Sequence, residues 1–132
     1  MTAYYCDFNA IIAAPFKYCT NKHRLLAYSY IMQHLEDHNM LADLQNLDNE
    51  VSAEYKIIIK SEWGMEYQLI PRHIHHINEA EHAIFTSKAH FISILSGIVH
   101  NSPNNLCYLL LPQAELTLNL LHQANLNPNI SA

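Results

Sequence analysis

The chain has 132 residues, of which 50% are hydrophobic and only 14% are charged, a composition that fits one globular domain and excludes a disordered polymer. Seven Lys and Arg against twelve Asp and Glu give a formal net charge of -5, which argues against tight binding to a polyanion. The three cysteines cannot all pair and have no C-x-x-C spacing, so we expect reduced thiols rather than a disulfide framework.

A β-hairpin and a helix are predicted for the first part of the chain. Short apolar runs at Tyr4–Cys6 and Asn9–Phe16 flank a D-F-N turn, a pattern typical of a hairpin. Thr20 or Asn21 can cap the helix that follows, and apolar residues at three- and four-residue intervals extend it to about His38.

The next predicted strand ends at an acid. Met40–Leu47 alternates in hydrophobicity and leads into L-D-N-E, so Asp48 is expected at the carboxyl end of the strand. Open α/β sheets bind their ligands at this end of the strands. From this segment alone, the simpler interpretation of Asp48 is a polar strand end or an Asx-turn.

A second helix and strand complete an α/β order. Ser52 is a helix N-cap, Trp63 is near the helix end, and Gly64 occupies the position where a left-handed C-cap is needed. Glu66–Ile70 is a strand that stops at a proline. The order β-β-α-β-α-β predicts an α/β fold.

The helix that begins near Asn78 and ends at Gly97 carries two patterns. Its inward stripe at helical spacing consists of Ala80, Ala83, Ile84, Ser87, Phe91 and Leu95. A neighbouring face consists of Glu81, Phe85, Lys88 and Ile92. A basic side chain therefore shares the face of the acid Glu81.

The carboxyl-terminal part is predicted to be one apolar helix followed by an irregular tail. Leu106–Gln123 is strongly apolar and contains Pro112, so we expect a kink or two abutting helices. From Asn125 onward there is no helical pattern. We therefore divide the chain into a domain, 1–124, and a truncated tail, 125–132.

The sequence opens on no basic, apolar leader, and it has no run of about 18 apolar residues that could span a bilayer. We therefore expect an intracellular protein, in the nucleus or the cytoplasm, with no membrane partner.

Three histidines, His73, His75 and His76, form an H-x-H-H motif just before the long helix. Neutral imidazoles are common zinc ligands, but a structural site needs four ligands, and no helical pair or neighbouring cysteine completes this one. A polar loop is the simpler interpretation, and a histidine-based zinc site is the alternative.

Four segments of the chain, taken in order, match the pattern of one known family. They are N-A-I-I-A-A-P-F-K at Asn9–Lys17, L-D-N-E at Leu47–Glu50, Y-Q-L-I-P-R-H-I-H-H-I-N-E-A-E-H-A-I-F-T-S-K-A-H-F at Tyr67–Phe91 and L-L-P-Q-A-E-L-T-L-N-L-L at Leu110–Leu121. Together they resemble the integrase catalytic domains of retrotransposons, in the retroviral integrase superfamily. The resemblance covers nearly the whole chain.

The resemblance implies an RNase H-like fold, with a mixed five-stranded sheet and flanking helices, that cuts and joins DNA. Its triad of two aspartates and a glutamate binds Mg²⁺ or Mn²⁺, for which carboxylates are suitable ligands. By position, Asp48 matches the second aspartate and Glu81 the glutamate, so both would be catalytic and metal-binding. Lys88 matches a basic residue that faces DNA, Asn78 matches the asparagine shortly before the acid, and Arg72 is a candidate phosphate contact.

One part of the family pattern has no match in this chain. The first aspartate of the family lies on a strand upstream of the hairpin, whereas Met1 and Thr2 stand where the second strand should begin. The zinc-binding amino-terminal and DNA-binding carboxyl-terminal domains of the family have no match either. We therefore expect an amino-terminally truncated core, inactive in strand transfer, with weak binding of metal and DNA.

Two other functions are compatible with the sequence. The chain could be a non-catalytic α/β interaction module that forms a homodimer through its apolar last helix, Leu106–Leu121. It could also be a zinc-binding protein that uses His73, His75 and His76. Integrase cores dimerise as well, so a dimer alone does not separate the first alternative from an integrase core.

Overall fold

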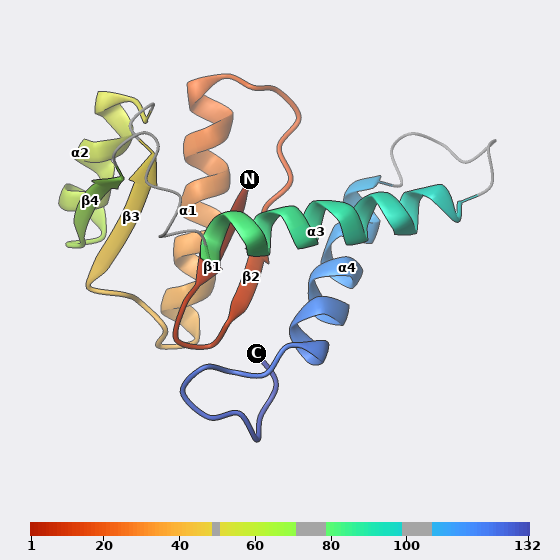
Figure 1. Cartoon of the computed structure of the whole chain (residues 1–132). Coiled ribbons are helices and arrows are strands. Elements are labelled where there is room, and N and C mark those ends of the chain that lie inside the picture. The colour runs from red at the N-terminus through yellow and green to blue at the C-terminus, as the bar shows by residue number, and fades with distance from the viewer. Residues whose placement is uncertain (49–50, 71–78, 99–106) are drawn as a thin grey trace. The chain divides into compact units, whose positions relative to one another are not determined.

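The computed structural model describes residues 1–48, 51–70, 79–98 and 107–132 (Figure 1). The chain divides into two compact units: Met1–Tyr18 with Asn78–Ala132 form the first, and Cys19–Ile77 the second. Across the described ranges the secondary structure consists of four helices and two two-stranded sheets. The predicted α/β class is confirmed at this level.

The first unit begins with the predicted hairpin, in which β1 (Thr2–Tyr5) pairs antiparallel with β2 (Ala10–Ala13). Asn9 closes the turn with a φ of 54°, a left-handed conformation that asparagine tolerates better than most residues. The Tyr4 hydroxyl donates to Asn9 Oδ1 at 3.1 Å and holds the turn. All four residues of β2 are buried, so this strand belongs to the core.

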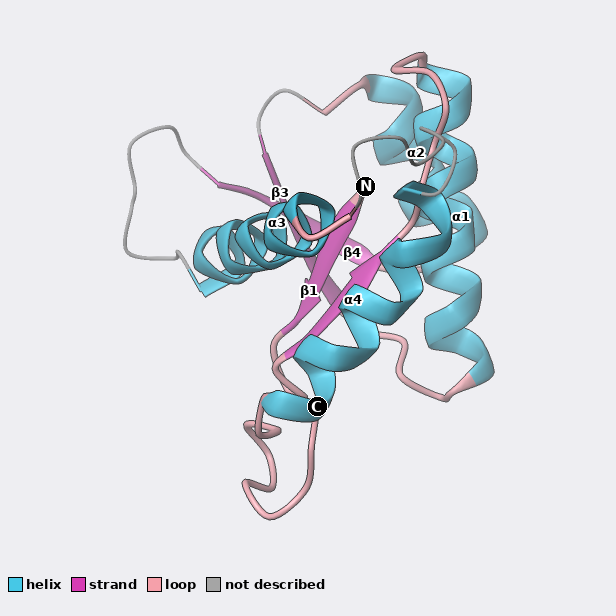
Figure 2. Ribbon diagram, turned by 90° about the vertical axis from the view of Figure 1, so that its right-hand side faces the viewer, coloured by secondary structure: helices cyan, strands magenta, loops and turns pink. Residues whose placement is uncertain are grey.

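Two long helices pack on the hairpin (Figure 2). α3 (Glu79–Ser96) contacts both strands, and α4 (Cys107–Leu121) contacts β2 and α3. Ile11 of β2 is 0% exposed and forms one hydrophobic cluster with Ala83 of α3 and Leu118 of α4. Burial of these apolar side chains stabilises the packing of the helices on the hairpin.

Side chains of α4 bind the backbone of β2 directly. The Ile11 N–H donates to Asn119 Oδ1 at 2.9 Å, and Asn119 Nδ2 donates back to the Ile11 carbonyl oxygen at 2.8 Å. The Ala13 N–H donates to Glu115 Oε2 at 2.9 Å. These backbone groups are thus satisfied by a helix instead of by a third strand.

The carboxyl-terminal segment, residues 122–132, is a closed loop that docks on the hairpin turn. The Ala124 N–H donates to the Ile130 carbonyl at 3.0 Å, which brings the ends of the loop together. Bonds to the hairpin run from Asn125 Nδ2 to the Cys6 carbonyl at 2.6 Å, from the Leu126 N–H to the Asp7 carbonyl at 2.9 Å and from Asn9 Nδ2 to the Gln123 carbonyl at 3.1 Å. The tail, for which the sequence predicted no regular structure, is therefore part of the first unit.

The second unit begins with α1 (Asn21–Asp37), whose ends are those that the sequence predicts. The Thr20 side chain accepts from the His23 N–H as an N-cap. Asn39 follows the helix with a φ of 55°, the left-handed conformation common just after a helix. The inward face of α1 consists of Ala27, Tyr28, Ile31, Met32 and Leu35.

A β-α-β segment completes the second unit. β3 (Leu44–Asp48) pairs in parallel with β4 (Glu66–Ile70), and α2 (Ala53–Glu62) is the crossover that parallel strands require. Ser52 caps α2, and Gly64 has the positive φ, 63°, that the sequence predicts for it.

A tyrosine pair, of which Tyr28 is buried and Tyr55 half-buried, joins the helices of the second unit. The rings of Tyr28 from α1 and Tyr55 from α2 lie 4.4 Å apart, and the Tyr28 hydroxyl donates to Gln45 Oε1 of β3 at 2.7 Å. Burial raises the pKa of both phenols because it disfavours the charged phenolate. The ring contact joins α1 to α2, and the hydrogen bond joins α1 to β3.

The predicted elements and the observed ones agree in order and type. α4 continues as one helix through Pro112, where the sequence left open a kink or two abutting helices. The described strands form one antiparallel pair and one parallel pair, and the mixed five-stranded sheet that the resemblance implies stays a prediction. None of the described helices is long and apolar enough to cross a membrane.

We predict that Glu115→Gln changes how stability depends on pH. Burial raises the pKa of the Glu115 carboxyl, so above its usual pKa the folded chain holds more protons than the unfolded chain, and stability falls as pH rises through that window. Glutamine keeps an acceptor for the Ala13 N–H but does not titrate. Relative to the parent, the free energy of unfolding of the variant should therefore rise from pH 4 to pH 7, as urea denaturation would measure.

The control for this prediction is Glu62→Gln, because that side chain is exposed on α2. The difference in free energy of unfolding between this control and the parent should stay nearly constant over the same pH range. If the difference in free energy of unfolding between Glu115→Gln and the parent is also independent of pH, burial does not penalise the charged form of Glu115.

Candidate functional site

Asp48 lies where the sequence predicts it, at the carboxyl end of a parallel strand. It is the last residue of β3 and stands opposite Ile70, the last residue of β4. The carboxyl ends of two parallel strands thus meet at one edge, where α/β proteins bind ligands. For Asp48 the structure describes the backbone alone.

Glu81 and Lys88 lie on the exposed face of α3. Ala83 is buried, and since each helical residue turns by about 100°, Glu81 lies about 200° and Lys88 about 140° around the axis from it. Both side chains therefore point away from the core, and both are exposed. Phe85 and Ile92 lie on the same face, and their side chains are 70% and 64% exposed.

This face, Glu81, Phe85, Lys88 and Ile92, is called the α3 stripe below. It brings an acid, an aromatic ring and an ammonium group onto three turns of one helix. Glu81 is in the first turn of α3, where the helix dipole also favours a carboxylate, so its position has a structural explanation as well.

The remaining predicted residues lie outside the described part of the chain. Arg72 and Asn78, predicted to contact DNA, are among them, and so are His73, His75 and His76 of the alternative zinc site. The described site residues are divided between the units: Asp48 belongs to the second, whereas Glu81 and Lys88 belong to the first. Each is therefore described within its own unit.

Three or more potential metal ligands do not come together anywhere in the described ranges. The Asp48 side chain and the H-x-H-H motif lie outside the described part of the chain, so this statement does not include them.

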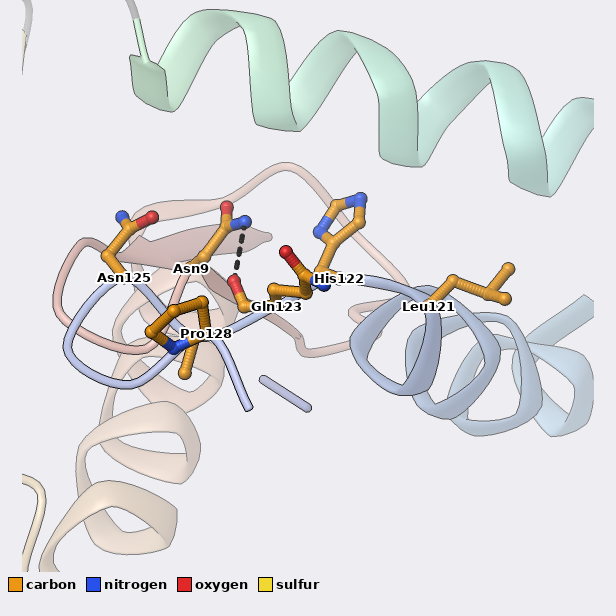
Figure 3. Close-up of a pocket in the computed structure, with 7 residues that line it drawn as sticks. Asn9, Leu121, His122, Gln123, Asn125 and Pro128 are labelled. Atoms are coloured by element: carbon orange, nitrogen blue, oxygen red, sulfur yellow. Dashed lines mark hydrogen bonds between the residues drawn. The ribbon is translucent and has the colours of Figure 1, made fainter. Parts of the chain in front are cut away.

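A cavity of about 450 Å³ in the first unit was not predicted from the sequence (Figure 3). Its lining comes from the hairpin turn, the end of α4 and the loop after it, and consists of Asn9, Leu121, His122, Gln123, Ala124, Asn125 and Pro128. Among the described groups, His122 Nδ1 is buried and has no hydrogen-bond partner. The hydrogen bond from Asn9 Nδ2 to the Gln123 carbonyl crosses this region, so the cavity exists only because the tail docks on the hairpin.

No protein-family model matches this chain, and no curated protein matches it. The resemblance to integrase cores is therefore carried by the four sequence segments alone.

We predict that Glu81→Gln and Lys88→Gln leave stability nearly unchanged. Both side chains are exposed, and substitutions at such surface positions usually change the free energy of unfolding by less than about 0.5 kcal/mol. Leu118→Ala, in the core formed by α3, α4 and β2, should by contrast lower the free energy of unfolding by about 2–5 kcal/mol. Urea denaturation of the three variants checks this, and a loss above about 1 kcal/mol for either α3 stripe variant would show that it supports the fold.

Proposed function

We propose that the chain is a fragment of a retrotransposon-type integrase core with an RNase H-like fold. Asp48 and Glu81 bind a divalent cation, Mg²⁺ or Mn²⁺, as two of the three carboxylates of the family site. Lys88, Asn78 and Arg72 contact the DNA backbone. With no match for the first aspartate, the chain binds the cation and DNA weakly and does not join DNA strands.

The observation that carries this proposal is the location of the two acids. Asp48 ends a parallel strand of a β-α-β segment, and Glu81 is exposed in the first turn of the helix that follows the next strand. The exposed position of Glu81 suits a metal ligand, because the ion must keep room for water and phosphate oxygens. Lys88, two turns after Glu81, adds a positive charge on the same side.

The pairing of the strands also supports the proposal. The resemblance implies a mixed five-stranded sheet, and the described strands comprise one antiparallel pair and one parallel pair. A mixed sheet contains both kinds of pair.

The net charge limits how strongly the chain can bind DNA. Phosphate contacts supply most of the non-specific affinity for nucleic acid, and a formal charge of -5 opposes them. Binding by this chain is thus local, through the α3 stripe and its neighbours, and strongly salt-dependent.

Titration calorimetry with Mn²⁺ tests the proposed metal site. The parent should bind the ion weakly, and Asp48→Asn or Glu81→Gln should each lower the affinity by about tenfold or more, because each removes a ligand. Asp43→Asn is the matched control: it removes one exposed carboxylate just before β3 and should leave binding unchanged. Equal Mn²⁺ affinity in the parent and Asp48→Asn would contradict the proposed site.

Two further outcomes would each change the assignment. Mg²⁺-dependent nicking or joining of DNA by the parent chain, abolished by Glu81→Gln, would show that the chain is an active enzyme. One equivalent of zinc bound at sub-micromolar affinity, and lost on substitution of His73, His75 and His76, would favour the zinc-binding alternative.

A second candidate function is a homodimeric interaction module. The observation in its favour is the outer face of α4, where Leu109, Leu116 and Leu120 are each more than half exposed. Residues at these positions lie on one side of a helix, and an apolar stripe of this kind often contacts another subunit.

If α4 forms a homodimer, Leu116→Ser with Leu120→Ser should convert the chain to a monomer, as light scattering after gel filtration would measure. Both leucines are exposed, so the monomer should keep its helical circular dichroism spectrum. The matched control, Leu26→Ser with Ile57→Ser, changes equally exposed residues of the second unit and should leave the mass unchanged. A parent chain that is monomeric at all concentrations would exclude the homodimeric module.

A further inference from the structure

The two sides of β2 differ in what they pair with. Met1 and Ala14 continue the hairpin ladder, because the Ala14 N–H donates to the Met1 carbonyl at 2.8 Å. Hydrogen-bonded positions alternate along an antiparallel pair, so Ile12 and Ala10 also face β1. The backbone groups of Ile11 and Ala13 therefore point to the opposite side, the outer edge of β2.

α4 covers this outer edge, and its side chains bond to the β2 backbone where a neighbouring strand would. The carboxamide of Asn119 has one N–H donor and one C=O acceptor side by side, as a peptide group has, and it exchanges both hydrogen bonds with Ile11 at 2.8 and 2.9 Å. Glu115, one turn earlier, accepts from Ala13 at 2.9 Å. Four residues of helix rise about 6 Å and two residues of strand about 6.8 Å, so the two spacings nearly match.

The covered edge belongs to a segment that would pair readily with another strand. Residues Ala10–Ala14 read A-I-I-A-A, with no charge and no proline, and every one of them is buried. Proteins block such edges with charges, prolines, bulges or a covering element, since an open apolar edge is a template for pairing between chains. In the first unit the covering element is α4.

We propose that α4 protects the outer edge of β2, and that loss of the Asn119 contact makes this edge pair with the same edge of a second copy. An extended strand is the occupant that fits alternating N–H and C=O groups, and the second copy supplies one of identical sequence. Two identical edges can pair antiparallel about a two-fold axis, so each strand satisfies the Ile11 and Ala13 groups of the other. This inference is independent of the proposed integrase function.

Asn119→Leu in the full chain tests the proposal. It removes both bonds to Ile11 and puts an apolar side chain of similar size in place of the carboxamide. The amide of Ile11 should exchange its hydrogen about tenfold faster or more in dilute samples, as expected for the loss of about 1.5 kcal/mol of hydrogen bonding. At higher concentration the apparent mass by sedimentation should rise at least to that of a dimer.

The matched control is Gln113→Leu, which adds a leucine to an exposed position of the same helix without touching β2. It should keep the mass and the Ile11 exchange rate of the parent. Ala13→Pro added to Asn119→Leu should reverse the association, because proline removes the outward N–H of Ala13 that a second strand would use.

A folded Asn119→Leu variant that has the mass of the parent at every concentration would overturn the proposal, as would association that Gln113→Leu reproduces. If Asn119→Leu does not fold, Asn119→Asp decides, because it keeps the acceptor for the Ile11 N–H and turns a charged carboxylate oxygen, in place of the donor, toward the Ile11 carbonyl oxygen. Association of Asn119→Asp with faster Ile11 exchange would support the proposal, and a parent-like mass and exchange rate would overturn it.

Discussion

The hydrogen bonds between the Asn119 carboxamide and the Ile11 backbone are the contact on which the first unit depends. A two-stranded hairpin is marginal in water, and β2 is entirely buried, so its outward backbone groups need partners that water cannot supply. Asn119 satisfies two of them with one side chain. Because this contact fixes α4 against β2, Leu118 enters the core beside Ile11, and the cluster that also holds Ala83 of α3 can form.

The orientation of α3 follows from the same core. With Ala83 anchored inward, helical geometry turns Glu81 and Lys88 outward, so the packing of the core determines the exposure of the candidate acid. The helix that covers β2 thus also determines which face of α3 meets solvent. In the second unit the pair of Tyr28 and Tyr55 has a similar role, since it joins α1 and α2, and Tyr28 also bonds to the strand that ends at Asp48.

Local signals in the sequence predicted the elements and several of their ends. Thr20 and Ser52 cap helices, and Gly64 has the positive φ that a left-handed cap requires, because each of these effects depends on a few neighbouring residues. The contact of Asn119 with Ile11 was not predictable in this way. It joins residues 108 positions apart, and an asparagine in an apolar helix carries no sign of its partner.

The candidate site was predictable to the same extent. The positions of Asp48 at a strand end and Glu81 on an exposed helix face follow from strand alternation and helical period. The cavity beside His122 was not predictable, since it depends on how the loop after α4 closes on the hairpin turn. The RNase H-like sheet and the metal site stay predictions, because they concern how the two pairs of strands combine.

The central claim, that Asp48 and Glu81 bind one ion, can be tested most directly by nuclear magnetic resonance with Mn²⁺. A paramagnetic ion broadens the amide signals of residues close to it. The account predicts that substoichiometric Mn²⁺ broadens the signals around Asp48 and Glu81 together, and that Asp48→Asn abolishes both effects. Broadening around one acid alone, or around His73, His75 and His76 instead, would contradict it.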